Sequence, residues 1–64
     1  MKRRDLIAYL EAQGCSFVRE GAKHTWFVGP NGRSYASIPR HREIVSFLAR
    51  KICRELAIPL PQIR

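Results

Sequence analysis

Apolar residues at the start of the chain follow the spacing of a helix. Within residues 3–13, Leu6, Ile7 and Leu10 recur at the i, i+1, i+4 positions of one helical face. Asp5 falls in the first turn, where a carboxylate interacts favourably with the exposed backbone amides. Gly14 follows, and glycine adopts the left-handed conformation of a helix end at low cost. The pattern predicts a helix over residues 3–13 that ends at Gly14.

Strand-favouring residues then form three short segments separated by turns. The predicted strands are 15–20, 23–29 and 33–38. Only about two or three residues separate the first two, which favours a hairpin. The second connection is Gly29-Pro30-Asn31-Gly32, the strongest turn signal in the chain, and Pro39 ends the third segment. We therefore expect a three-stranded antiparallel meander.

The last part of the chain returns to helical spacing over residues 42–57. The apolar positions are Ile44, Val45, Leu48, Ile52 and Leu56, with Phe47, Ala49 and Cys53 widening the stripe. Lys51 and Glu55 can form an i, i+4 pair, and Pro59 ends the helix before a short tail over 58–64. The chain is thus expected to be one α+β domain over 1–64, ordered helix, strand, strand, strand, helix, with both helices on one face of the sheet.

The charge of the chain points to a polyanionic partner. Twelve Lys and Arg residues against five Asp and Glu give a net charge of +7 and a pI near 10.5. The apolar fraction of 45% is too high for a disordered basic tail, so the charge belongs to a folded surface. Nucleic acid is the commonest polyanion in a cell, and charge alone leaves a generically basic protein as the alternative.

The cysteines and histidines lack the spacing of a metal site. Cys15 and Cys53 lie far apart, without a C-x-x-C motif or a preceding signal peptide, which favours reduced, buried thiols in a cytoplasmic protein. A zinc site would need these cysteines to meet His24 and His41 from four unrelated places. We expect no metal and no cofactor. No apolar run is long enough to cross a bilayer, so no membrane association is expected.

Hairpin geometry brings the polar residues with candidate chemistry to one end of the sheet. With the second turn centred on residues 31–32, His24 lies opposite Ile38 or Pro39. Because a strand rises only ~3.3 Å per residue, Arg40 and His41 are expected within roughly 10 Å of His24. The first turn brings further polar residues to the same end. The residues expected there are Arg19, Glu20, Lys23, His24, Arg40 and His41.

The strand pattern leaves open which face His24 occupies. Trp26 and Val28 share its parity, whereas Thr25 and Phe27 share the opposite one, and either set could form the core. We favour helices covering the Phe27 side, which leaves His24 and Trp26 accessible.

These residues suit cleavage of RNA without a metal ion. A neutral imidazole at His24 can take the proton of a ribose 2′-hydroxyl, which then attacks the adjacent phosphodiester. Lys23, Arg19 and Arg40 can contact phosphates and stabilise the developing negative charge, and His41 is a second titrating group that could serve as the acid. The five acidic residues are scattered, which argues against a carboxylate cluster for Mg²⁺. The same residues also fit a small basic RNA-binding module without catalytic activity.

The ordered set of motifs resembles the HicA family of toxins from bacterial toxin-antitoxin pairs. The matching stretches are Gly14-Cys15, Val18-Arg19-Glu20-Gly21, His24, 39–44 and 48–56, and the similarity covers residues 1–58. The resemblance implies a fold like the double-stranded-RNA-binding domain and activity as an mRNA-cleaving endoribonuclease. It also implies that His24 is catalytic and that a HicB antitoxin covers the active surface. We expect the free toxin to be a monomer.

Two other function classes stay open. A double-stranded-RNA-binding module reads A-form shape over about 16 base pairs and needs lysines at the start of its last helix. Here the cations of that helix, Arg50, Lys51 and Arg54, lie in its middle, which counts against such a module. A protein that only docks an acidic partner is the other class, and a steep salt dependence of RNA binding would argue against it.

Overall fold

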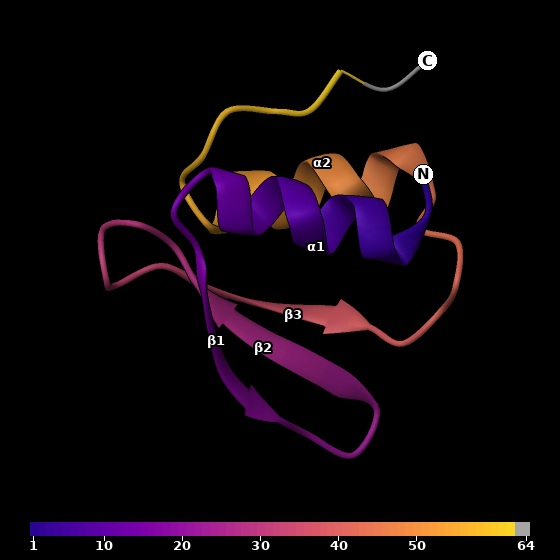
Figure 1. Ribbon diagram of the computed structural model, residues 1–64, viewed down its shortest axis with the longest axis horizontal. Helices are drawn as coiled ribbons and strands as arrows, with labels where there is room; N and C mark the ends of the chain where they lie inside the picture. The colour runs from indigo at the N-terminus through magenta and orange to yellow at the C-terminus, as the bar shows by residue number, and fades with distance from the viewer. Residues whose placement is uncertain (63–64) are drawn as a thin grey trace.

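The computed structural model describes residues 1–62 and consists of two helices packed on one face of a three-stranded sheet (Figure 1). The elements are α1 (Arg3–Ala12), β1 (Ser16–Glu20), β2 (His24–Val28), β3 (Tyr35–Pro39) and α2 (Ser46–Glu55). The strands are antiparallel in the order β1-β2-β3. The predicted α+β architecture and its element order are confirmed.

Helix α1 forms where the apolar spacing predicts it. Leu6 and Leu10 are fully buried, while the opposite side of the helix is exposed. The helix ends in a Schellman motif: the amide of Gly14 donates to the carbonyl of Glu11 at 3.0 Å, and that of Cys15 donates to Leu10 at 2.9 Å. Gly14 has φ of +91°, a conformation that glycine adopts without the steric cost of a Cβ. The predicted helix end is therefore confirmed.

The turn between β2 and β3 is built by one asparagine. The Oδ1 atom of Asn31 accepts hydrogen bonds from the amides of Arg33 and Ser34 at 2.8 and 2.9 Å. The amide of Gly29 donates to the carbonyl of Ser34 at 2.7 Å and closes the loop. Gly29 also lies against the end of α2, since a Cβ there would be 2.1 Å from the carbonyl oxygen of Leu56. This close approach couples the hairpin to the last helix.

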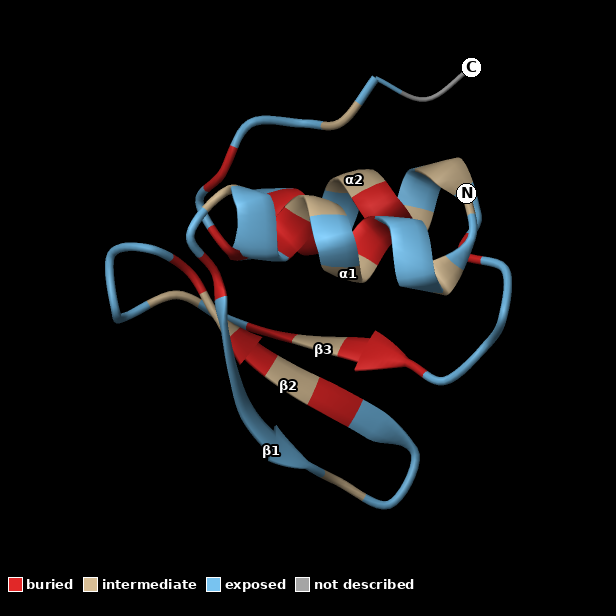
Figure 2. Ribbon diagram, viewed as in Figure 1, coloured by how far each residue is buried: buried red, intermediate tan, exposed pale blue. Residues whose placement is uncertain are grey.

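Alternation along β2 and β3 separates a core face from an open face (Figure 2). Thr25 and Phe27 are buried, Phe27 with only 3% of its surface exposed, and both lie on the side of the helices. His24 is exposed and Trp26 is half-buried on the other face. The favoured orientation is confirmed. The buried hydrophobic residues are Leu6, Leu10, Cys15, Phe27, Ala36, Ile38, Ile44, Ala49, Ile52, Cys53, Leu56 and Ile58.

Helix α2 begins at Ser46, and the predicted start at residue 42 is wrong. The backbone before it pairs with the beginning of the chain: the amide of Arg3 donates to the carbonyl of Arg42, and that of Ile44 donates to Met1, both at 2.8 Å. Ile44 is fully buried, so its apolar character reflects core packing rather than a helical turn. Long-range backbone pairing has overridden the local helical pattern.

Both cysteines are free and buried, as the sequence predicts. Burial raises the pKa of the Cys15 thiol, and burial together with nearby Cys15 raises the pKa of Cys53. Within residues 1–62, no helix has the length and apolar character needed to span a bilayer.

Candidate active site

His24 is the first residue of β2, at the exit of a tight turn. The amide of Gly21 donates a hydrogen bond to the carbonyl oxygen of His24 at 2.8 Å, which closes the turn between β1 and β2. A Cβ at Gly21 would lie 3.2 Å from that same carbonyl oxygen, so the position favours glycine. The turn fixes the backbone of His24 and leaves its imidazole exposed.

An open groove of about 370 Å³ contains His24 and the second histidine of the chain. It lies between the end of the β2–β3 ladder and one side of α2. Its lining residues are His24, Ser37, Pro39, His41, Leu48, Lys51, Ile52 and Glu55. The groove thus combines two imidazoles with an ammonium and a carboxylate.

The strand register explains why both histidines reach the groove. His24 pairs with Pro39, one of the two partners that the hairpin geometry predicts, and His41 follows two residues later. Trp26 pairs with Ser37, and paired residues of an antiparallel ladder project to the same face. Ser37 therefore shares the open face with His24. The predicted approach of His41 to His24 is reflected in their common groove.

Lys51 is a charged groove residue that the sequence pattern did not place at the site. The sequence predicts it as a partner of Glu55 and as one of three cations in the middle of the helix, and the pair is present, with Nζ 3.7 Å from the Oε2 atom of Glu55. Leu48 and Ile52, which flank Lys51 in the helix, also line the groove. Arg50 and Lys51 both interrupt the apolar residues of this helix, and which of the two meets β3 depends on packing that the pattern does not encode.

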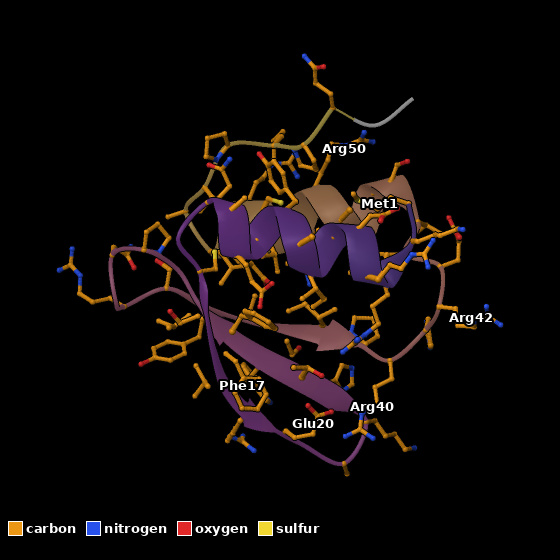
Figure 3. The ribbon with its side chains drawn as sticks, in the orientation of Figure 1. Met1, Phe17, Glu20, Arg40, Arg42 and Arg50 are labelled. Atoms are coloured by element: carbon orange, nitrogen blue, oxygen red, sulfur yellow. The ribbon has the colours of Figure 1, made fainter. Side chains whose placement is uncertain are left out.

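Arg40 is directed away from the groove. Its Nη2 atom forms an ion pair with the carboxylate of Glu20 and donates to the carbonyl of Gly21 at 2.8 Å. Figure 3 shows Arg40 and Glu20 side by side at the end of the first hairpin. The same carboxylate accepts a hydrogen bond from Thr25 Oγ1 at 3.0 Å, and Thr25 in turn accepts one from Arg3 at 2.7 Å. Arg40 therefore braces the turn that carries His24.

Arg19 and Lys23 lie outside the groove lining as well. The guanidinium carbon of Arg19 is 5.5 Å from the ring centroid of Trp26, a cation–π arrangement on the open face. Lys23 is exposed in the turn before His24. Of the predicted site residues, the groove thus brings together His24 and His41, while Arg19, Lys23 and Arg40 lie outside its lining, on β1, in the first turn and directly after β3. Within residues 1–62, no three His, Cys, Asp or Glu side chains form a metal-binding group.

Comparison with known proteins identifies a family but no individual relative. Neither the curated proteins nor the solved structures gave a match. The family model described as HicA toxin of bacterial toxin-antitoxin matches residues 3–58 of the 64, from the first residue of α1 to just beyond α2. The match includes every residue that lines the groove. The chain belongs to the HicA toxin family of bacterial toxin-antitoxin systems.

Proposed function

We propose that this HicA toxin is a metal-independent endoribonuclease that binds and cleaves mRNA in the cytoplasm, with His24 as its principal catalytic residue. HicA family toxins are mRNA interferases. One observation carries the proposal: His24, His41 and Lys51 line the same open groove. Two imidazoles can serve as the base and the acid that cleavage of a phosphodiester needs, and a nearby cation can stabilise the negative charge that develops on the phosphate.

The reaction uses His24 as base and His41 as acid. His24 takes the proton from a ribose 2′-hydroxyl, and the 2′-oxygen forms a bond to the adjacent phosphorus. The bond between phosphorus and the 5′-oxygen breaks, and His41 supplies the proton that this leaving oxygen requires. The products are a 2′,3′-cyclic phosphate and a free 5′-hydroxyl. Histidine suits both roles because its charge changes near neutral pH.

Lys51 supplies positive charge where negative charge develops on the phosphorus oxygens. Its ammonium has three donors and lies 3.7 Å from the Glu55 carboxylate, in an exposed i, i+4 pair on the groove side of α2. Donors directed at the phosphorus oxygens stabilise the negative charge that develops there in the transition state. Arg19, Lys23 and Arg40 are the proposed phosphate contacts outside the groove, in keeping with the net charge of +7. Arg40 takes part only through the guanidinium N–H groups that Glu20 and the Gly21 carbonyl leave free.

Cleavage of labelled mRNA in EDTA tests the proposal, with wild type compared with His24→Ala. We expect cutting by the wild type alone, RNA binding by both proteins in a gel shift, and fragments ending in 2′,3′-cyclic phosphate. Circular dichroism controls for folding of the variant, whose exposed side chain is outside the core. Equal cutting by both proteins, or loss of cutting by the wild type in EDTA, would contradict the proposal.

The alternative of a non-catalytic RNA-binding module has less support. Such a module needs lysines at the start of its last helix. The first turn of α2 instead begins with Ser46 and Phe47, and Phe47 has 70% of its surface exposed. RNA binding without cutting by either protein would favour this alternative.

A HicB-type antitoxin is the proposed protein partner, and it covers the groove to stop cleavage. Membership of the HicA family implies this pairing. Hydrogen exchange on the complex tests it: we expect protection at residues 37–41 and 48–55, together with loss of RNA cleavage. Inhibition of cleavage with unchanged exchange at both segments would show that the antitoxin binds elsewhere.

A further inference from the structure

A second cleft, of about 480 Å³, lies beside the groove and is lined almost entirely by cations. Its walls come from the first residues of the chain and from the segment after β3. The lining residues are Lys2, Arg3, Arg4, Arg40, Arg42 and Glu43. Figure 3 labels Arg40 and Arg42 at the same end of the molecule as Met1. We call this site the cationic cleft.

Backbone pairing holds the two cationic segments together. Lys2 and Glu43 form an antiparallel bridge, and the amide of Arg3 donates to the carbonyl of Arg42 at 2.8 Å. The fully buried Leu6 and Ile44 anchor the two segments in the core. Like charges repel when they are brought close, so the cations that line the cleft destabilise one another. A bound anion would relieve this repulsion.

The cations of the cleft differ in whether they already form hydrogen bonds or ion pairs within the protein. Arg3 donates from Nε to the carbonyl of Pro39 at 3.0 Å and from Nη2 to Thr25, and Arg40 is paired with Glu20. Arg4 lies 3.9 Å from Asp5 in an exposed and weak contact. Lys2 and Arg42 are exposed and have no ion pair among residues 1–62. Lys2, Arg4 and Arg42 are thus available to a ligand.

The same short segment lines both sites. Pro39 and His41 line the groove, whereas Arg40 and Arg42 line the cationic cleft. Because adjacent residues of this segment line the two sites, an RNA strand whose scissile phosphate lies at His24 can extend from the groove to the cleft. Arginine matches the geometry of phosphate oxygens and stays charged at all physiological pH values.

We infer that the cationic cleft binds phosphates of the same RNA strand that flank the scissile phosphate. This inference rests on the proposed ribonuclease function and extends it, because it makes Lys2, Arg4 and Arg42 determinants of substrate length. Cleavage then depends on nucleotides beyond the one attacked. A dinucleotide, which has no flanking phosphate, gains nothing from the cleft.

The test compares the triple variant Lys2→Gln/Arg4→Gln/Arg42→Gln, which removes three charges, with the control Arg33→Gln/Arg54→Gln, which removes two charges outside both sites. Arg33 and Arg54 are exposed and outside both sites. We expect the triple variant to lower the ratio of kcat/KM for an oligoribonucleotide over a dinucleotide on the order of tenfold. In binding assays with an oligonucleotide carrying 2′-deoxyribose at the cleavage site, the salt slope falls by roughly 2, since each lost phosphate contact removes about 0.7.

The outcomes separate this inference from the proposed function. Equal ratios and equal salt slopes for the triple variant and the control overturn the inference while leaving cleavage intact. Absence of cutting by every protein, with RNA affinity still lost in the triple variant, removes the nuclease proposal but keeps a phosphate-binding cleft. Loss of antitoxin affinity with unchanged RNA affinity overturns the inference in favour of an acidic protein surface as the occupant. Thermal unfolding confirms that both variants are folded.

Discussion

His24 lies directly opposite Pro39 in the β2–β3 ladder, and this pairing brings His41 into the groove that His24 lines. Pro39 is buried, and its carbonyl oxygen accepts a hydrogen bond from Arg3 of α1 at 3.0 Å. The end of β3 is therefore held by β2 through the strand pairing and by α1 through the hydrogen bond from Arg3. The segment that leaves it carries His41 toward the groove and Arg40 and Arg42 toward the cationic cleft.

Replacing the second histidine tests the assignment of acid and base. We expect His41→Gln to lower the cleavage rate by about 10²- to 10⁴-fold, the usual contribution of a positioned acid or base. A general acid works only while it is protonated, so in the wild type the cleavage rate falls at alkaline pH. The variant should no longer show this alkaline fall, whereas the fall at acidic pH, which comes from the base, should persist. Ser37→Ala is the matched control in the groove. A profile with both sides intact would rule out His41 as the acid.

Lys51 is expected to be worth more to catalysis than any other cation of α2. Lys51→Gln should lower kcat by about 10²-fold, comparable to the loss of one donor to a developing oxyanion. Arg54→Gln, in the same helix but outside the groove, should have little effect on kcat. Single-turnover cleavage with saturating enzyme separates this effect from RNA binding. Similar losses in the two variants would show that only the overall charge of the helix matters.

Ala57 offers a simple route to a more stable protein. It follows α2 with φ of +59°, and it ends the helix in a Schellman motif like that of Gly14, with Ile58 donating to Cys53 at 3.1 Å. The left-handed conformation costs a residue with a Cβ about 1–2 kcal/mol, and the added freedom of glycine in the unfolded chain offsets about 0.4–1 kcal/mol of that. Ala57→Gly should therefore raise the free energy of unfolding by about 0.5–1 kcal/mol.

Urea denaturation measures the effect, and Ala8→Gly is the control. Ala8 is exposed inside α1, where glycine should lower stability by about 0.5–1 kcal/mol. Destabilisation by both substitutions would mean that the strain at Ala57 is smaller than its dihedral angle indicates.

The buried thiols predict a loss of stability in alkaline solution. Burial raises the pKa of Cys15 and Cys53 above the ordinary value of 9.0, so a thiol ionises in the unfolded chain before it ionises in the folded one. Ionisation then favours unfolding. Each thiol contributes fully to stability at pH values below its pKa in the unfolded chain, and this contribution is lost as the pH rises through its pKa in the folded chain. The urea midpoint should fall between about pH 8 and about pH 10.

The double variant Cys15→Ala/Cys53→Ala isolates this effect. It should start from a lower stability, because it loses buried volume, yet show a shallower fall over the same pH range. An equally steep fall would assign the alkaline sensitivity to other groups, such as Tyr9, whose pKa burial also raises.

Local patterns in the chain were enough to predict the order of the elements and to narrow the register of the second hairpin to two neighbouring pairings. The spacing of Leu6 and Leu10 defines the buried side of α1, and the Asn31 turn places His24 opposite Ile38 or Pro39, of which the structure has Pro39. Such signals act over a few residues, so they can be read without knowing the rest of the fold. The approach of His41 to His24 follows from counting along that hairpin.

Contacts between segments far apart in the chain decided where α2 begins and which side chains share the groove. The backbone of Arg42 and Ile44 pairs with Arg3 and Met1 rather than extending α2, and no local periodicity encodes that choice. The docking of α2 against β3 turned Lys51 into the groove, and the ion pair with Glu20 turned Arg40 out of it. The sequence alone therefore determined the order of the elements and the candidate residues at the end of the sheet near His24. The packing of helix on sheet determined which residues share the groove, Lys51 among them, because that packing depends on the whole core at once.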